Sequence, residues 1–376
     1  MTGRSMARLS ETLAQLAQAQ RAAAARFAEQ PEGEDSRLRP LESFGANPGA
    51  LRALTYVPEA TSDRRMPLVV VLHGCTQTAT GYDRGAGWSD LADRHGFAVL
   101  YPEQQRANNG NLCFNWFDAE DIRRGGGEAQ SIRSMIATMV RDVAIDPDRI
   151  YVTGLSAGGA MAGVMLATYP ELFAAGAIIA GLPYGTATSM SQALDRMRGR
   201  GLPADSALAA LVDGAAPAGG RVPRVSVWHG DADATVVPAN ADAIVAQWRG
   251  VHGLAYAPDE VEQVEGHAHR LWRDAQGRAA VEEYRIRGLG HGTPLATTGA
   301  DGLGQPGPHM LEAGISSTLH SAAFFGLIER PSARAAATRA KPKPASPRPH
   351  PWSHSPGRSQ VGDMINGALR AAGLLR

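Results

Sequence analysis

A serine set among glycines, between a strand pattern and a helix pattern, restricts the fold of this chain more than any other feature. The run Gly154-Leu155-Ser156-Ala157-Gly158 has the form G-x-S-x-G. Residues 149–153 before it are rich in β-branched side chains, and mostly small residues follow it from 157 to 169. A tight turn from strand to helix is strained, so small residues must flank its centre. The pattern therefore predicts a nucleophile elbow that presents the Ser156 hydroxyl at the end of a strand.

The surrounding sequence, from residue 50 to 330, alternates short apolar runs with longer stretches of helical composition. We predict strands at 68–72, 97–101, 149–153, 177–180, 225–228 and 281–286, and helices at 84–95, 128–143, 157–169 and 239–251. The last of these strands alternates polar and apolar residues, which is typical of a strand at the edge of a sheet. Strands separated by helices favour a mostly parallel sheet with helices on both faces. The predicted fold class is α/β.

Composition divides the chain into segments around this core. Residues 1–49 are expected to form an amphipathic helix and a lead-in, and residues 50–330 the catalytic domain. Within it, residues 185–220 are rich in Ala, Gly and Met without a strand pattern, which predicts an insertion or a lid. Residues 331–360 have the Pro-rich, basic composition of a disordered linker, and residues 361–376 have the spacing of a short helix.

The charge balance and the cysteine count exclude several classes of function. Lys plus Arg and Asp plus Glu both number 37, so the formal net charge is zero and a nucleic-acid partner is not expected. No apolar run approaches the ~18–20 residues of a membrane-spanning helix. The first residues lack the unbroken apolar stretch of a secretory signal, so we expect a cytoplasmic protein. Two cysteines are too few for a zinc site, and we expect no metal and no organic cofactor.

A serine nucleophile needs a base and an acid, which follow it in the order Ser, Asp or Glu, His in folds with this elbow. The strand at 225–228 leads into His229-Gly230-Asp231-Ala232-Asp233. We favour Asp233 as the acid, because the first residues of the loop are needed to turn the chain. Asp231 stays as the alternative, and is otherwise a residue that stabilises the turn.

The base is predicted to be His291, which lies after the last predicted strand and between two glycines, Gly290 and Gly292. Glycines give the loop the freedom to carry an imidazole over the end of the sheet. Six other histidines of the domain are interpreted as surface or packing residues because of their positions in the chain: His73, His229, His267, His269, His309 and His320.

The oxyanion of an acyl-transfer reaction needs two N–H donors. Ala157, directly after the nucleophile, supplies one, and Cys75, after the predicted bend at Gly74, is our second. The alternative is that His73-Gly74 is an ordinary turn at the end of a strand. Trp116 and Phe117 are predicted either to line the acyl pocket or to lie in the buried core.

Several motifs together resemble the poly(3-hydroxybutyrate) depolymerase family of esterases. They are Leu72-His73-Gly74-Cys75-Thr76-Gln77, Asn111-Leu112-Cys113-Phe114-Asn115-Trp116-Phe117, Gly154-Leu155-Ser156-Ala157-Gly158-Gly159, Gly181-Leu182-Pro183-Tyr184-Gly185, His229-Gly230-Asp231-Ala232-Asp233 and Gly288-Leu289-Gly290-His291-Gly292. The resemblance implies the α/β-hydrolase fold, a small-molecule or oligomeric ester of a short hydroxy acid as substrate, an acyl-enzyme, and an extracellular location. It assigns the triad to Ser156, Asp233 and His291, and the oxyanion loop to Cys75. Alternatives on the same fold are an acetyl or feruloyl carbohydrate esterase, an acyltransferase or thioesterase, and a non-catalytic binding protein.

The same resemblance implies that Cys75 and Cys113 pair, because each matching motif carries one cysteine. Such a bond would close a loop of about forty residues and hold the amide of Cys75 in place. The alternatives are two buried, inert thiols, as a reducing cytoplasm would favour, and a nucleophilic cysteine.

Overall fold

The computed structural model describes residues 36–59, 65–217 and 219–331. The chain divides into two units, 1–39 and 40–376, and the fold described here is that of the second. The predicted N-terminal helix, the linker at 331–360 and the helix at 361–376 lie outside the described residues, apart from position 331. A two-residue strand, β1 (Arg39–Pro40), lies at the junction of the units.

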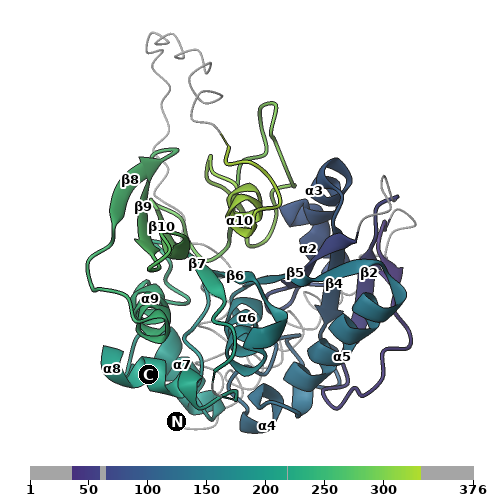
Figure 1. Ribbon diagram of the computed structural model, residues 1–376, viewed down its shortest axis with the longest axis horizontal. Coiled ribbons are helices and arrows are strands. Elements are labelled where there is room, and N and C mark those ends of the chain that lie inside the picture. Colours follow the sequence, from purple (N-terminus) through teal and green to yellow (C-terminus); the bar gives the residue numbers. More distant parts are fainter. Residues whose placement is uncertain (1–35, 60–64, 218, 332–376) are drawn as a thin grey trace, which may run out of the picture. The chain divides into compact units, whose positions relative to one another are not determined.

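A large, mostly parallel sheet forms the centre of the second unit, as predicted (Figure 1). Its strands follow the order β2-β4-β3-β5-β6-β7-β10-β9-β8. Neighbours from β4 to β10 pair in parallel, whereas β2, β9 and β8 pair antiparallel to their neighbours. The strands are β2 (Arg52–Tyr56), β3 (Met66–Leu72), β4 (Ala98–Glu103), β5 (Ile145–Leu155), β6 (Ala175–Ile179), β7 (Arg224–Gly230), β8 (Glu260–Val264), β9 (His267–Arg273) and β10 (Ala279–Ile286). Each predicted strand overlaps one of them.

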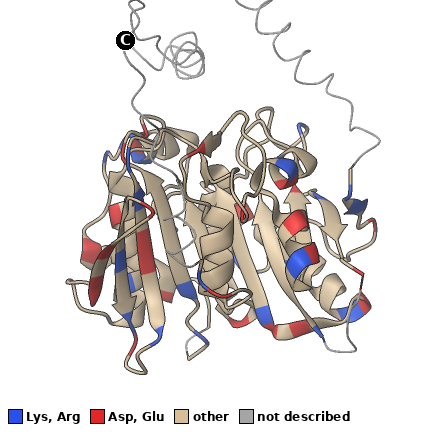
Figure 2. Ribbon diagram, turned by 90° about the horizontal axis from the view of Figure 1, so that it is seen from above, with Lys and Arg blue, Asp and Glu red and all other residues tan. Residues whose placement is uncertain are grey.

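The expectation that 281–286 is an edge strand is wrong. β10 lies between β7 and β9, and the exposed edge beyond them is β8. The polar residues of β10 have partners inside the sheet: Glu282 accepts a hydrogen bond from Ser226, and Glu283 pairs with Arg270. Alternation in this strand therefore reflects paired charges and not solvent. Figure 2 shows these charges as red and blue bands on β8, β9 and β10, next to mostly tan central strands.

Helices cover both faces of the sheet (Figure 1). One face carries α2 (Ala79–Ala86), α3 (Trp88–His95) and α10 (Ser317–Phe325), and the other carries α4 (Ala119–Ile122), α5 (Gly127–Asp142), α6 (Ala157–Thr168) and α9 (Ala239–His252). All residues of α6 are buried, as expected of a helix without a polar side. Adjacent residues of β5 point to opposite faces of the sheet. Tyr151 stacks on Phe325 of α10 with 4.7 Å between ring centroids, whereas Val152 joins the core that includes Met161 of α6.

The predicted insertion at 185–220 contains two helices, α7 (Met190–Met197) and α8 (Asp205–Asp213). Leu208 of α8 packs against Ala243 and Ala246 of α9, so α8 belongs to the helical layer. Ala193 of α7 instead lies in an apolar cluster with Ala157. Only α7 is therefore placed beside the elbow. The shorter elements are a 3-10 turn at Pro170–Leu172 and a parallel pair of strands, β11 (Thr293–Leu295) and β12 (Met310–Glu312).

Candidate active site

Ser156 lies on a strained turn between β5 and α6. Its φ is 57° and its ψ is −116°. Residues other than glycine rarely adopt a positive φ. Its N–H donates to the Ile179 carbonyl at 2.8 Å, which fastens the turn to β6. A Cβ atom at Gly154 would lie 2.4 Å from the Gly158 carbonyl oxygen, and one at Gly158 would lie 2.3 Å from that of Leu72. Glycine is therefore required at both positions by close backbone packing.

The hydroxyl of Ser156 is the first of three groups joined by short hydrogen bonds. It lies 2.8 Å from Nε2 of His291, whose Nδ1 lies 2.7 Å from Oδ2 of Asp233. The carboxylate can only accept, so the proton is on Nδ1 and Nε2 is free to accept the serine proton. A hydroxyl, an imidazole and a carboxylate in this order can carry out nucleophilic acyl transfer.

The two candidate acids have different surroundings. Asp233 is buried, and its Oδ1 accepts hydrogen bonds from the N–H groups of Thr235 at 2.8 Å and Val236 at 2.9 Å. Burial by itself raises the pKa of Asp233, but the hydrogen bond from His291 and the nearby histidine charges outweigh it, and the net shift is downward. Asp231 is exposed, and its Oδ1 accepts from the Gly288 N–H at 2.6 Å. The structure thus places Asp233 against the imidazole of His291. It places Asp231 at the start of the histidine loop, residues 288–292.

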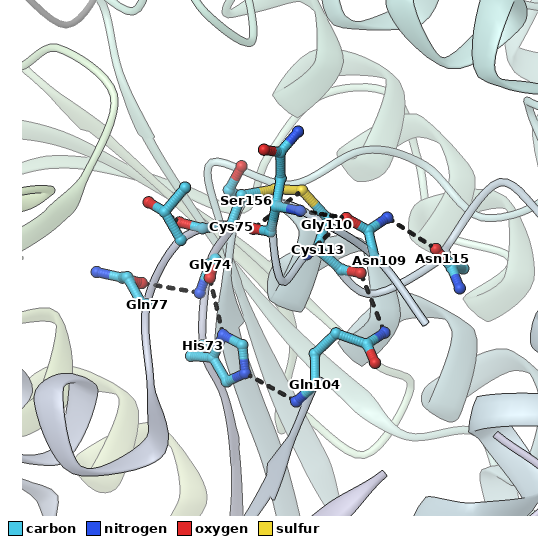
Figure 3. The surroundings of a disulfide bond; sticks show 12 residues. His73, Gly74, Cys75, Gln77, Gln104, Asn109, Gly110, Cys113, Asn115 and Ser156 are labelled. Carbon is cyan, nitrogen blue, oxygen red and sulfur yellow. Dashed lines mark hydrogen bonds between the residues drawn. A yellow bond between two sulfur atoms is a disulfide. The ribbon is translucent and has the colours of Figure 1, made fainter. Parts of the chain in front are cut away.

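The oxyanion loop, residues 73–77, follows β3 and passes beside Ser156 (Figure 3). Gly74 donates its N–H to Oε1 of Gln77 at 2.8 Å, so that amide is already used. The N–H groups of Cys75 and Ala157 have no acceptor among the described residues. Ala157 also begins α6, whose N-terminal dipole favours negative charge. Two unoccupied donors therefore flank the serine.

Three links hold the oxyanion loop to a segment about 35 residues further along the chain. A disulfide joins Cys75 to Cys113, and the Thr76 N–H donates to the Asn111 carbonyl at 2.7 Å. His73 donates from Nδ1 to the Gly74 carbonyl at 2.8 Å and accepts the Gln104 N–H on Nε2 at 3.1 Å (Figure 3). Burial lowers the pKa of His73 to about 4, so its ring is neutral and this pattern of donors is fixed near neutral pH.

Behind the disulfide lies a buried carboxyl group, which sequence reasoning missed. Glu128 accepts hydrogen bonds from the Gln104 side chain and from the Asn115 N–H. The Gln104 amide also donates to the Cys113 carbonyl at 3.1 Å, so it links Glu128 to the disulfide segment. Burial raises the pKa of Glu128 to about 8, with Asp121 contributing in the same direction.

The two aromatic residues predicted near the acyl pocket differ in burial. Trp116 is 7% exposed and packs in the cluster that contains Ala157 and Ala193. Phe117 is partly buried and meets Trp116 edge to face, with 5.6 Å between centroids. Trp116 therefore lies in core packing that supports the elbow, whereas Phe117 keeps part of its surface exposed.

Three of the histidines interpreted as packing residues touch the site. His73 supports the oxyanion loop. His229 donates from Nε2 to the Val236 carbonyl at 2.8 Å and lies 3.5 Å from Oδ2 of Asp233. His309 contacts the backbone of His291. For His73 the sequence held a local signal of its supporting role: its motif ends in Gln77, whose side chain accepts the Gly74 N–H. For His309 the sequence offers none, because it lies 18 residues after its partner.

No membrane-spanning helix is present among the described residues: none there has both the length and the apolar composition to cross a bilayer. Within the same ranges, no group of three or more His, Cys, Asp or Glu side chains is arranged to hold a metal ion.

Comparison with known proteins finds a matching family and several similar proteins. The profile described as esterase PHB depolymerase matches residues 51–266. Poly(3-hydroxyalkanoate) depolymerase C of Paucimonas lemoignei is 45% identical over 296 residues, which are 77% of this chain and 70% of that protein. Acetylxylan esterase A of Aspergillus oryzae is 31% identical over 262 residues, covering 68% and 83%. Among solved structures, an acetyl xylan esterase from Aspergillus awamori matches with a TM-score of 0.65 and 26% identity, over 77% of this chain and 99% of that one.

Proposed function

This chain belongs to the PHB depolymerase family of esterases, and from that premise we propose that it hydrolyses esters of short 3-hydroxy acids, in polymer fragments or oligomers. It is a serine ester hydrolase of the α/β-hydrolase fold. The proposal assigns the chemistry to Ser156, His291 and Asp233, and the catalytic domain to residues 50–330.

In the proposed mechanism His291 takes the proton of Ser156 as the serine attacks the ester carbonyl. Asp233 holds the imidazole with its proton on Nδ1 and stabilises the charged ring that forms. The N–H groups of Cys75 and Ala157 donate to the oxyanion, each typically contributing about 3–4 kcal/mol. The alcohol leaves with a proton from His291, and water activated by the same residue then releases the acid. No step uses a metal or an organic cofactor.

One observation carries the assignment of the residues: the hydrogen-bonded series Ser156–His291–Asp233 with two free amides beside the serine. The hydroxy-acid substrate rests on the relative of 45% identity, which is named as a poly(3-hydroxyalkanoate) depolymerase. The relatives named as acetylxylan esterases support a second candidate, removal of acetyl groups from a carbohydrate. Phe117, at the less buried side of the aromatic pair, is proposed to contact the acyl part of either substrate.

The disulfide bears on where the protein acts. Bonds such as Cys75–Cys113 persist in oxidising compartments and are rare in a reducing cytoplasm. The expectation of a cytoplasmic protein therefore has no support in the structure, and we place its activity in an oxidising, extracellular environment.

The substrate is tested by rates over a panel of esters. kcat/KM is measured on 3-hydroxybutyrate dimers to tetramers, on p-nitrophenyl esters of rising chain length, and on acetylated xylo-oligosaccharides. We expect the hydroxybutyrate oligomers to be preferred, and the opposite ranking would favour the carbohydrate esterase. The Ser156→Ala variant is the matched blank, because it removes one oxygen from a site whose geometry is set by backbone. Wild-type turnover by that variant would refute the serine mechanism altogether.

A further inference from the structure

A second histidine lies against the proposed base. Nδ1 of His309 is 3.0 Å from the His291 carbonyl oxygen, and the two rings meet edge to face with 5.7 Å between centroids. A carbonyl oxygen can only accept, so His309 carries its proton on Nδ1. Burial lowers the pKa of His309, and the backbone hydrogen bond opposes that shift only in part. The neutral ring is therefore the form that makes this contact near neutral pH.

The backbone of His309 holds the residues just after the base. Its carbonyl accepts the Thr293 N–H at 2.8 Å, at the point where β11 and β12 begin to pair. A Cβ atom at Gly292 would lie 2.8 Å from the same carbonyl oxygen, so the two segments touch without space between them. His309 thus contacts the chain on both sides of Gly292.

This arrangement is maintained against local backbone preference. His309 has a φ of 60°, a left-handed conformation that residues with a Cβ rarely adopt. Strained residues of this kind persist where the surrounding structure holds them, and they are concentrated at functional sites. Here the strained residue directs a ring nitrogen to the carbonyl of the base.

The histidine loop, residues 288–292, is held before His291 at Leu289, whose carbonyl accepts the Ala232 N–H at 3.1 Å, but it is less closely packed at two of its glycines. Gly288 has a φ of 70°, and an added Cβ at Gly288 or Gly290 would meet nothing within 4 Å. Asp231 fastens the start of the loop through the Gly288 N–H. Between Gly288 and Thr293, the His309 side chain hydrogen-bonds to the backbone at the carbonyl of His291. A displacement of about 1 Å at a reacting group can reduce the rate about 100-fold.

We propose that His309 is a positioning residue, whose Nδ1–H holds the His291 carbonyl so that the imidazole of His291 stays aimed at Ser156. The proposal rests on the triad proposed above. It deepens that assignment by adding a fourth side chain, which acts through the backbone of the base.

Two substitutions separate the hydrogen bond from the backbone strain. His309→Gly relieves the positive φ but removes the donor. His309→Asn keeps the positive φ and the donor. Asn tolerates the left-handed region, and its Nδ2 is bonded to Cγ just as Nδ1 of histidine is. His252→Ala is the control: His252 also donates to a backbone carbonyl, that of Pro223 at 2.9 Å, and burial lowers its pKa too.

We expect His309→Gly to lower kcat about 10- to 100-fold with KM changed by less than about twofold, and His309→Asn to restore most of the loss. The downfield proton resonance of His291 Nδ1–H, bonded to Asp233, should stay sharp in His309→Asn and broaden in His309→Gly. His252→Ala should lower the melting temperature without changing kcat.

A wild-type kcat in His309→Gly would overturn the proposal, and so would equal losses in the Gly and Asn variants. Either result leaves the triad intact as long as Ser156→Ala is inactive, so the failure of His309 is distinguishable from failure of the proposed function.

Discussion

The elbow at Ser156 and the oxyanion loop at residues 73–77 lie beside each other, but different interactions hold them. The elbow is fixed by backbone packing: Gly154 and Gly158 allow main-chain atoms of β3, β5 and α6 to approach within distances that exclude a Cβ. The oxyanion loop is fixed by links that involve side chains: a disulfide to Cys113, and hydrogen bonds from the Gly74 N–H to Gln77 and from the Gln104 N–H to the His73 ring. Backbone packing tolerates almost no substitution, whereas a cross-linked loop should lose its geometry in steps.

The largest expected effect is on the triad, whose serine lies on the elbow. Asp233→Asn should lower kcat about 10⁴-fold, because the amide stabilises the wrong tautomer of His291. Asp231→Asn is the matched control. It should change kcat by less than about threefold, since its Oδ1 can still accept the Gly288 N–H. Steady-state kinetics of the two variants decide between them, and the reverse ranking would show that Asp231 is the acid.

The oxyanion loop should lose stability and rate together when its cross-link is removed. The disulfide closes a loop with a sequence separation of 38, for which chain entropy gives a stabilisation of about 4 kcal/mol as an upper figure. The double variant Cys75→Ser, Cys113→Ser should approach that loss in urea unfolding. We also expect kcat to fall about tenfold, because the Cys75 amide is less well aimed. Wild-type stability and kcat in this variant would show that hydrogen bonds alone hold the loop.

The elbow should respond to a single methyl group by losing stability. Gly158→Ala places a Cβ 2.3 Å from the Leu72 carbonyl oxygen, so the backbone must shift at a cost of about 3 kcal/mol. Gly110→Ala adds the same methyl group where no atom lies within 4 Å, and should change the unfolding free energy by less than about 0.5 kcal/mol. If the two alanine variants unfold alike, close packing does not fix the elbow.

The smallest effect concerns pH and again belongs to the oxyanion loop. His73 has a pKa of about 4 in the folded protein against 6.5 when unfolded, so the unfolded chain binds more protons between these values. Stability should therefore fall as pH decreases through this window, by about 2 kcal/mol from this residue at pH 5. Unfolding free energies of the wild type and His73→Phe, measured from pH 7 to 4.5, should converge as pH falls. Parallel curves would contradict the assignment.

The same contrast explains which parts of the site could be predicted. The elbow, the acid loop and the histidine loop each follow a strand and carry small residues or turns, so each has a local pattern. The structure brings Ser156, Asp233 and His291 together as that pattern predicts. The supporting residues have no such pattern. Gln104 and Glu128, near the oxyanion loop, and His309, beside His291, are recognisable only through partners far along the chain.

The sequence by itself determined the fold class and the positions of six strands along the chain, since apolar periodicity depends on near neighbours. It also located the serine turn, because the G-x-S-x-G pattern stands between a strand pattern and a helix pattern. It did not predict β2, β8 or β9. Only the tertiary structure decided that the charged strand β10 is internal, that α8 joins the helical layer, and which amides beside Ser156 are free. Those outcomes depend on which distant segments the folded sheet brings side by side, and a buried polar group is satisfied by whatever partner packs against it.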